Sequence, residues 1–200
     1  MHQRVFGMAL AAASVVMMGS ALAAQESGSA FPFDTKRSPT IGHRGVVATS
    51  QPLAALAGLD ILKKGGNAID AAVATAAVLT VVEPHSTALG GDMFAMVYLE
   101  SEKKLVGLNG SGRSAYGMTL DDLKMRLDEQ GMERIGGIYS VSVPGAVAGW
   151  FTLLEEYGTM AMAEVLKPAI YYAEHGFHVT ERIGEAWAGS ERKLLREPPA

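Results

Sequence analysis

The first hydrophobic pattern of the chain predicts an amphipathic helix. Small or apolar residues recur at the i, i+3, i+4 and i+7 positions of one helical face, namely Ala55, Gly58, Leu59 and Leu62. Pro52 suits the first turn of such a helix, and Gly65-Gly66 ends it after the favourably placed Lys63-Lys64. We therefore expect a helix that begins near Pro52 and ends before Gly65.

The next segment predicts a second helix that is buried. Asn67 can cap its start, and Asp70, three residues later, forms a weaker version of a capping box. Residues 71–82 contain no charge, and a helix that is apolar on every face is buried on every face. Pro84 ends this helix.

Strand patterns follow, and helical patterns come after them. Two apolar runs, 94–99 and 104–108, flank the polar turn 100–103 and predict a β-hairpin, while residues 46–49 predict a short strand before the first helix. Further helices are expected from Thr119 and Asp122 to about residue 130, and over about 145–157, 160–175 and 180–195. The fold class is α+β, and helices dominate the second half.

Residues 1–24 predict a secretory signal peptide. Arg4 precedes a short apolar stretch, no charged residue follows until Glu26, and Ala21-Leu22-Ala23 has the Ala-x-Ala form of a cleavage site. A buried core helix and a membrane anchor are the alternatives, but a span needs about 20 apolar residues. We expect cleavage after this triplet or nearby. The mature chain is expected to be periplasmic or secreted and not to bind a membrane. Residues 25–41 are polar and predict an extended arm.

Composition and charge exclude several classes of protein. Hydrophobic residues make up 48% of the chain and charged residues 19%, which excludes a disordered protein. A formal net charge of -4 without a basic run gives no electrostatic basis for binding nucleic acid. The absence of cysteine excludes disulfides, thiolate metal sites and cysteine nucleophiles. His175 and His178 lie on the two sides of Gly176 near a predicted helix end, where solvated or capping histidines are the more common account, so no metal and no cofactor are expected.

Two glycine-containing loops are candidates for function. Leu89–Asp92 joins the buried helix to the hairpin, and its paired glycines let the backbone approach a neighbour closely. Asn109–Ser114 follows the second strand and places Arg113 beside hydroxyl groups. A guanidinium matches a carboxylate in a two-point fork, so Arg113 is a candidate carboxylate clamp. A surface arginine in a turn is the alternative. The sequence contains no Gly-x-Ser-x-Gly elbow, phosphate loop or dinucleotide fingerprint.

An ordered series of blocks between about His43 and Phe177 resembles the gamma-glutamyltransferase family. The most specific block is the run from Lys63 to Ala72, Lys-Lys-Gly-Gly-Asn-Ala-Ile-Asp-Ala-Ala. The blocks, in order, are Gly45–Ala54, Leu62–Ala74, Val81–His85, Gly90–Gly91, Phe94–Tyr98, Ser142–Gly145, Glu156–Thr159, Leu166–Ile170 and Ala173–Phe177.

The resemblance implies an N-terminal-nucleophile hydrolase with a four-layer α-β-β-α sandwich. Members of the family are made as precursors that cut themselves, and the new amino-terminal threonine of the small subunit is the nucleophile. Its freed α-amino group can accept the hydroxyl proton, and water or an amine then attacks the acyl-enzyme. Residues 42–200 would be the N-terminal portion of a truncated large subunit. The implied partners are the small subunit from the same precursor and a γ-glutamyl amide of the glutathione type.

Two departures from the family pattern bear on the site. The Thr-Thr-His-type nucleophile sequence does not occur in the 200 residues, so no catalytic residue is assigned and the chain alone is expected to be inactive. In an alignment without gaps, Ser111 falls on the family's carboxylate-binding arginine and Arg113 lies two residues later. These two residues are therefore the candidate substrate-binding residues.

The departures leave alternatives open. Arg113 reaches the same carboxylate from a reshaped loop, or the acyl group is not glutamyl. The protein would then be a related acylase or amidase that acts on a different acyl group. A non-catalytic secreted binding domain on the same scaffold is the third alternative.

Overall fold

The computed structural model describes residues 40–43, 45–130 and 140–194. The chain divides into two units, Met1–Ile41 and Gly42–Ala200, and of the first unit only residues 40 and 41 are described. The expected signal peptide over residues 1–24 lies outside the described residues, as does nearly all of the expected arm over residues 25–41. Both stay predictions.

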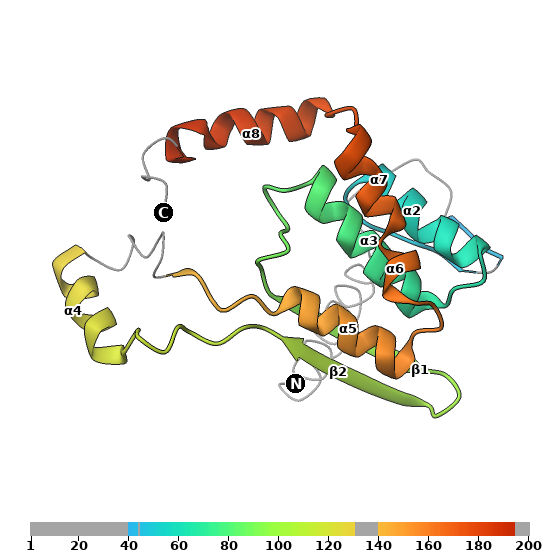
Figure 1. Ribbon diagram of the computed structural model, residues 1–200, viewed down its shortest axis with the longest axis horizontal. Coiled ribbons are helices and arrows are strands. Elements are labelled where there is room, and N and C mark those ends of the chain that lie inside the picture. Colours follow the sequence, from blue (N-terminus) through green and yellow to red (C-terminus); the bar gives the residue numbers. More distant parts are fainter. Residues whose placement is uncertain (1–39, 44, 131–139, 195–200) are drawn as a thin grey trace, which may run out of the picture. The chain divides into compact units, whose positions relative to one another are not determined.

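The described part of the second unit is mostly helical and contains a two-stranded sheet (Figure 1). Its elements, in chain order, are α2 (Pro52–Lys63), α3 (Ala68–Val82), β1 (Met93–Leu99), β2 (Lys104–Gly110), α4 (Leu120–Gln130), α5 (Ala146–Tyr157), α6 (Met162–Val165), α7 (Lys167–His175) and α8 (Glu181–Leu194). No helix in the described ranges is both long and apolar enough to cross a bilayer.

Helix α3 is the centre of the packing, and it contacts α2, α5, α6 and α7 (Figure 1). The prediction of a buried helix is confirmed along most of its length. Its Val73, Val78 and Val82 are fully buried, whereas Ala72 is exposed. The same core includes Ile61, Trp150, Leu153, Leu154 and Val165 from the neighbouring helices. A helix without a charged residue from Ala71 to Val82 gives the other helices a common surface on which to bury their own apolar faces.

Both of the first helices begin with the caps that their sequences predict or allow. The Oε1 atom of Gln51 accepts hydrogen bonds from the backbone N–H groups of Leu53 and Ala54, and Pro52 is the first residue of α2. At the start of α3, the predicted capping box is confirmed. Asn67 Oδ1 accepts from Asp70 N at 3.1 Å, and an Asp70 carboxylate oxygen accepts from Asn67 N at 2.8 Å.

The predicted hairpin is confirmed, and its strands extend slightly beyond the apolar runs. β1 and β2 pair antiparallel, with Met93 opposite Gly110 at one end and Leu99 opposite Lys104 at the other. Val97 is buried, and α5 contacts both strands. On the other face of β1, Phe94, Met96 and Tyr98 are 71%, 75% and 57% exposed, as the alternation of side chains along a strand requires.

Two sequence predictions are wrong. Residues 46–49 belong to neither a helix nor a strand, because no strand among the described residues lies beside them to complete a ladder; Val47 instead packs against Gly58 of α2. The helix expected over 160–175 is divided into α6 and α7. Pro168 lacks the N–H group that would bond to the carbonyl of Glu164, so the helical ladder is interrupted there.

The helix expected from Thr119 is confirmed as α4. The Oγ1 atom of Thr119 accepts a hydrogen bond from Asp122 N at 3.1 Å, which caps the first turn. The expected helices at 145–157 and 180–195 are confirmed as α5 and α8.

Candidate functional site

Three segments that are distant in sequence meet at one end of the hairpin, and we name them together the three-loop junction: residues 89–92, 110–113 and 142–146. The carbonyl of Gly91 accepts hydrogen bonds from Gly145 N at 3.1 Å and from Ala146 N at 3.0 Å. These two donors begin α5, whose N-cap residue Gly145 has no side chain to cap the helix. The backbone of the first loop therefore supplies the cap.

Asp92 binds the other two segments through one carboxylate oxygen. Its Oδ1 atom accepts from Gly112 N at 3.0 Å and from Ser142 Oγ at 2.8 Å, although Ser142 lies 50 residues away in sequence. The hydrogen bond from Gly112, followed by the one from Ser142, holds the pKa of the Asp92 carboxyl below its ordinary value. The residue is exposed, so this carboxylate is ionised and reachable from solvent at neutral pH.

The junction is too tight for side chains at two of its glycines. A Cβ atom on Gly112 would lie 1.4 Å from the carbonyl oxygen of Val143, and one on Gly145 would lie 2.1 Å from that of Gly110. Val143 N also donates to the carbonyl of Arg113 at 2.8 Å. Gly112 and Gly145 therefore permit the close approach of these backbones. The sequence predicts this role for Gly90-Gly91, but a Cβ atom on Gly90 would meet nothing within 4 Å and one on Gly91 would lie 3.3 Å from the Ala88 carbonyl, so the prediction is wrong at Gly90.

The structure places both predicted substrate-binding residues, Ser111 and Arg113, in this junction. Ser111 is exposed, and its N–H donates to Asn109 Oδ1 at 2.9 Å. The carbonyl of Arg113 accepts the hydrogen bond from Val143 N, and the residue is exposed to solvent. Sequence reasoning found this loop but missed the role of Asp92. A polar residue directly after paired glycines and directly before a strand was the available signal.

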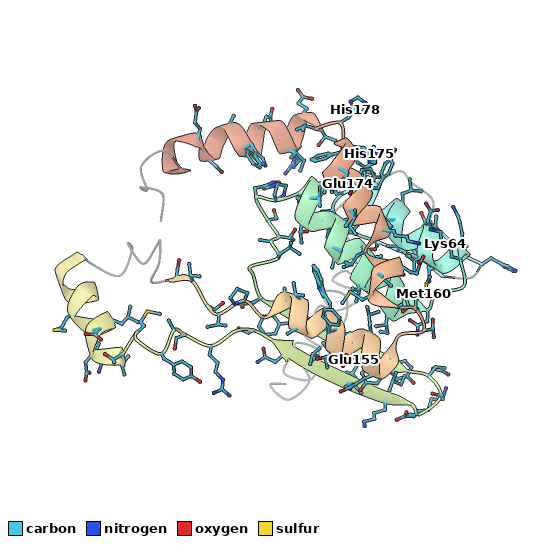
Figure 2. All side chains as sticks on the ribbon, in the orientation of Figure 1. Lys64, Glu155, Met160, Glu174, His175 and His178 are labelled. Carbon is cyan, nitrogen blue, oxygen red and sulfur yellow. The ribbon has the colours of Figure 1, made fainter. Side chains whose placement is uncertain are left out.

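A second polar cluster is buried, and we name it the Asp70 anchor: Asn67, Asp70, Tyr157, Thr159 and Met160. The Asp70 side chain is 0% exposed and accepts from Thr159 Oγ1 at 2.6 Å, Thr159 N at 3.0 Å and Met160 N at 3.1 Å. Asn67 Nδ2 donates to the carbonyl of Tyr157 at 2.6 Å. The anchor thus joins the start of α3 to the segment after α5, and Met160, in that segment, is labelled in Figure 2.

Burial and hydrogen bonding act in opposite directions on the Asp70 carboxyl. Burial alone would raise its pKa, but the hydrogen bonds from the Thr159 hydroxyl and from the N–H groups of Asn67, Thr159 and Met160 outweigh it and lower the pKa below its ordinary value. Every donor belongs to the protein backbone or to one threonine. The arrangement is that of a structural support rather than of an acid or a base.

Three other features of the described residues, a stacked histidine, the acidic groups and a cavity, do not form chemical sites. His175, labelled in Figure 2, stacks on Tyr171 at 4.6 Å between ring centroids, and its Nδ1 atom lies 3.0 Å from the Tyr171 carbonyl. Within the described ranges, no three acidic or histidine side chains are grouped so as to hold a metal ion. A cavity of about 630 Å³ between residues 45–49 and helices α2 and α3 has no titratable side chain in its lining.

Comparisons with known proteins give the family context. A family model described as gamma-glutamyltranspeptidase matches residues 54–200. The chain is 38% identical over 172 residues to the acylase ACY 1 proenzyme of Pseudomonas sp. strain V22, and 39% identical over 169 residues to the glutathione hydrolase proenzyme of Bacillus subtilis strain 168. These matches cover 83% and 82% of this chain but 31% and 28% of the relatives, so the chain spans less than a third of their length.

Solved structures agree with these relatives. The cephalosporin acylase of Bacillus halodurans matches with a TM-score of 0.74 and 43% identity, over 88% of this chain and 32% of that one. The gamma-glutamyltranspeptidase of Helicobacter pylori matches with a TM-score of 0.73 and 33% identity, over 80% of this chain and 46% of that one.

Proposed function

The chain belongs to the gamma-glutamyltranspeptidase family, and from this premise we propose that it is the N-terminal portion of the large subunit of a self-processing amide hydrolase or acyltransferase. The relatives named above are proenzymes, and this chain covers less than a third of each. The nucleophile is then a threonine in the part of the precursor that the present residues do not include. The described residues would form part of a four-layer α-β-β-α sandwich, and the protein would act in the periplasm or outside the cell.

The proposed reaction is transfer or hydrolysis of a γ-glutamyl amide. The threonine hydroxyl adds to the amide carbonyl, the base takes its proton, and the amine leaves with a proton while the acyl-enzyme ester forms. Water or a second amine then attacks that ester and releases the threonine. The present chain contributes to binding and orientation, which convert a bimolecular encounter into a positioned one.

One observation carries the choice of acyl group. Arg113 is exposed on a loop whose main chain is fixed on both sides of the residue, by Gly112 N to Asp92 and by Val143 N to the Arg113 carbonyl. A guanidinium in a fixed position can hold a carboxylate through two parallel hydrogen bonds. We assign to Arg113 the α-carboxylate of the glutamyl group, with Ser111 beside it as a further donor.

A related acylase is the second candidate. The relatives include acylase proenzymes, and the cephalosporin acylase structure shares 43% identity with this chain. In the gap-free alignment with the family pattern, Ser111 also occupies the position of the family's carboxylate-binding arginine. An acyl group without an α-carboxylate would leave the Arg113 guanidinium without its ligand.

Three matched anilides separate the two candidates in the complete, self-processed enzyme. γ-Glutamyl anilide carries both α-groups, glutaryl anilide lacks only the α-amino group, and 4-aminobutanoyl anilide lacks only the α-carboxylate. We expect wild-type kcat/KM to fall by about 100-fold or more when the carboxylate is removed, because a lost charge-assisted pair costs about 3 kcal/mol. Equal turnover of all three anilides would favour the acylase.

The matched variants assign the effect to Arg113. Arg113→Ala should lower kcat/KM by about 100-fold or more for γ-glutamyl and glutaryl anilides and leave 4-aminobutanoyl anilide near wild type. Arg113→Lys should recover part of the loss, because an ammonium lacks the two-point fork. Gel electrophoresis should show that self-processing is unchanged in both variants. A uniform loss on all three anilides would contradict the assignment.

A further inference from the structure

We propose that Asp92 is a positioning residue that holds the Arg113 loop in its binding-competent place, an inference that rests on the proposed function. Asp92 Oδ1 accepts from Gly112 N, and Gly112 directly precedes Arg113 in the chain. The same oxygen accepts from Ser142 Oγ, and the next residue, Val143, donates its N–H to the Arg113 carbonyl. The peptide units 111–112 and 113–114, on the two sides of Arg113, are therefore tied to one carboxylate, the first directly and the second through the Ser142-Val143 segment.

The dipeptide Gly91-Asp92 holds two elements at once. The Gly91 carbonyl caps the start of α5, and the Asp92 side chain holds the loop after β2. Because Gly112 has no room for a Cβ atom beside the Val143 carbonyl, the loop rests directly on the segment that Ser142 anchors. Removing the carboxylate takes the acceptor from Gly112 N and from Ser142 Oγ together, so the loop loses its hydrogen bond on the side that precedes Arg113.

The hydrogen bonds require an acceptor and do not require a charge. An Asp92→Asn variant keeps an Oδ1 acceptor of the same shape, which can serve both donors. A direct electrostatic contact between Asp92 and substrate would not survive the same change. The asparagine variant therefore separates positioning from direct binding.

The experiment uses the complete, self-processed enzyme with Asp92→Ala, Asp92→Asn, Ser142→Ala and the control Asp121→Ala, which removes an exposed acid on α4. For γ-glutamyl anilide, Asp92→Ala should raise KM about tenfold and change kcat less than about threefold, because the loss falls on substrate binding. Asp92→Asn and Asp121→Ala should stay within about threefold of wild type in both constants. Ser142→Ala should lie between Asp92→Ala and wild type.

Amide hydrogen exchange of peptides covering residues 109–114, measured without substrate, gives a readout that is independent of activity. Exchange should be faster in Asp92→Ala than in wild type and unchanged in Asp92→Asn. Unchanged exchange in Asp92→Ala overturns the proposal, as does faster exchange with an unchanged KM. An asparagine variant as impaired as the alanine variant also overturns it, in favour of direct charge recognition. Absence of turnover of any anilide by the wild-type enzyme overturns the proposed function instead, and the exchange comparison still decides whether Asp92 holds the loop.

Discussion

The Asp70 anchor and the three-loop junction use the same chemistry in opposite environments. In each, a carboxylate accepts hydrogen bonds from a distant hydroxyl and from at least one distant backbone N–H group, and in each the pKa of the carboxyl is lowered. Asp70 is 0% exposed beneath packed helices, whereas Asp92 is open to solvent. Donors left without a partner are costly in the first environment, while water can replace the carboxylate in the second.

The comparison teaches that a similar set of hydrogen bonds can serve stability in one place and loop geometry in another. Deleting a side chain at the Asp70 anchor should therefore change the free energy of unfolding, while deletion at the junction should change substrate binding. Four predictions test this division in the complete protein.

The largest effect is expected at the anchor. Asp70→Ala leaves the N–H groups of Thr159 and Met160 and the Thr159 hydroxyl without their acceptor, which should lower the free energy of unfolding by about 3–5 kcal/mol. Urea denaturation followed by circular dichroism measures it, and Asp70→Asn serves if the alanine variant does not accumulate. Asp60→Ala, which removes a surface ion pair with Lys63, is the control and should stay within about 0.5 kcal/mol. An Asp70→Ala variant as stable as this control would remove the distinction between the two regions.

The next effect concerns close backbone contact at the junction. Gly112→Ala places a methyl group against the Val143 carbonyl. We therefore expect the free energy of unfolding to fall by about 1–3 kcal/mol and the KM for γ-glutamyl anilide to rise. Gly117→Ala is the matched control, since a Cβ atom there meets nothing within 4 Å. Thermal denaturation and steady-state kinetics of both variants measure the difference. Equal behaviour of the two would show that the loop can separate from residue 143 without consequence.

A matched pair of hydroxyl deletions gives a smaller and sharper contrast. Thr159→Val removes one donor to buried Asp70 and should cost about 1 kcal/mol, because the carboxylate there has no water to replace it. Ser142→Ala removes one donor to exposed Asp92 and should cost less than about 0.5 kcal/mol, because water can take its place. Urea denaturation of the two variants and the wild type under the same conditions measures both values. The reverse order of the two costs would contradict the assignment of stability to the anchor.

The smallest effect is a dependence on pH. The folded-state pKa of Asp70 is lowered, so its contribution to stability is fully present above the unfolded-state value of about 3.9 and is lost as pH falls through the folded-state pKa. Wild-type stability should therefore decline below about pH 4, and Asp70→Asn should show a shallower decline from a lower starting value. Urea midpoints measured between pH 3 and pH 7 test this. An identical slope in the two proteins would mean that other carboxyls carry the acid sensitivity.

Local patterns predicted the elements well, and contacts between distant residues escaped prediction. The capping box of Asn67 and Asp70 depends on a spacing of three residues, and the hairpin depends on two apolar runs beside a polar turn, so both are readable in sequence. The partners of Asp70 lie 89 and 90 residues away, and no local rule pairs them. The strand expected over residues 46–49 failed for the related reason that a strand needs a neighbour.

The candidate site shows the same limit. Glycine content marked two loops as candidates, and the junction brings both loops together, but the close backbone approach expected at Gly90-Gly91 occurs at Gly112 instead. The sequence could not indicate that Asp92 would serve both Gly112 and Ser142, because these lie 20 and 50 residues from it. Arg113 was recognisable from its charge and its glycine neighbours, whereas the residue that holds its loop was not.

The long span of the Asp70 anchor also imposes an order on folding during synthesis. A nascent chain that ends before Thr159 can form the capping box at Asn67, but its Asp70 carboxylate has none of the donors from the segment after α5. The pairing of α2 with α3 needs only a short connection and can come first, whereas the anchor must close a loop of 89 residues. Until the ribosome has delivered that segment, α3 has only its local cap. The arrival of Thr159 and Met160 supplies the missing donors to Asp70, and the core around α3 is completed later, when α6 and α7 have been made.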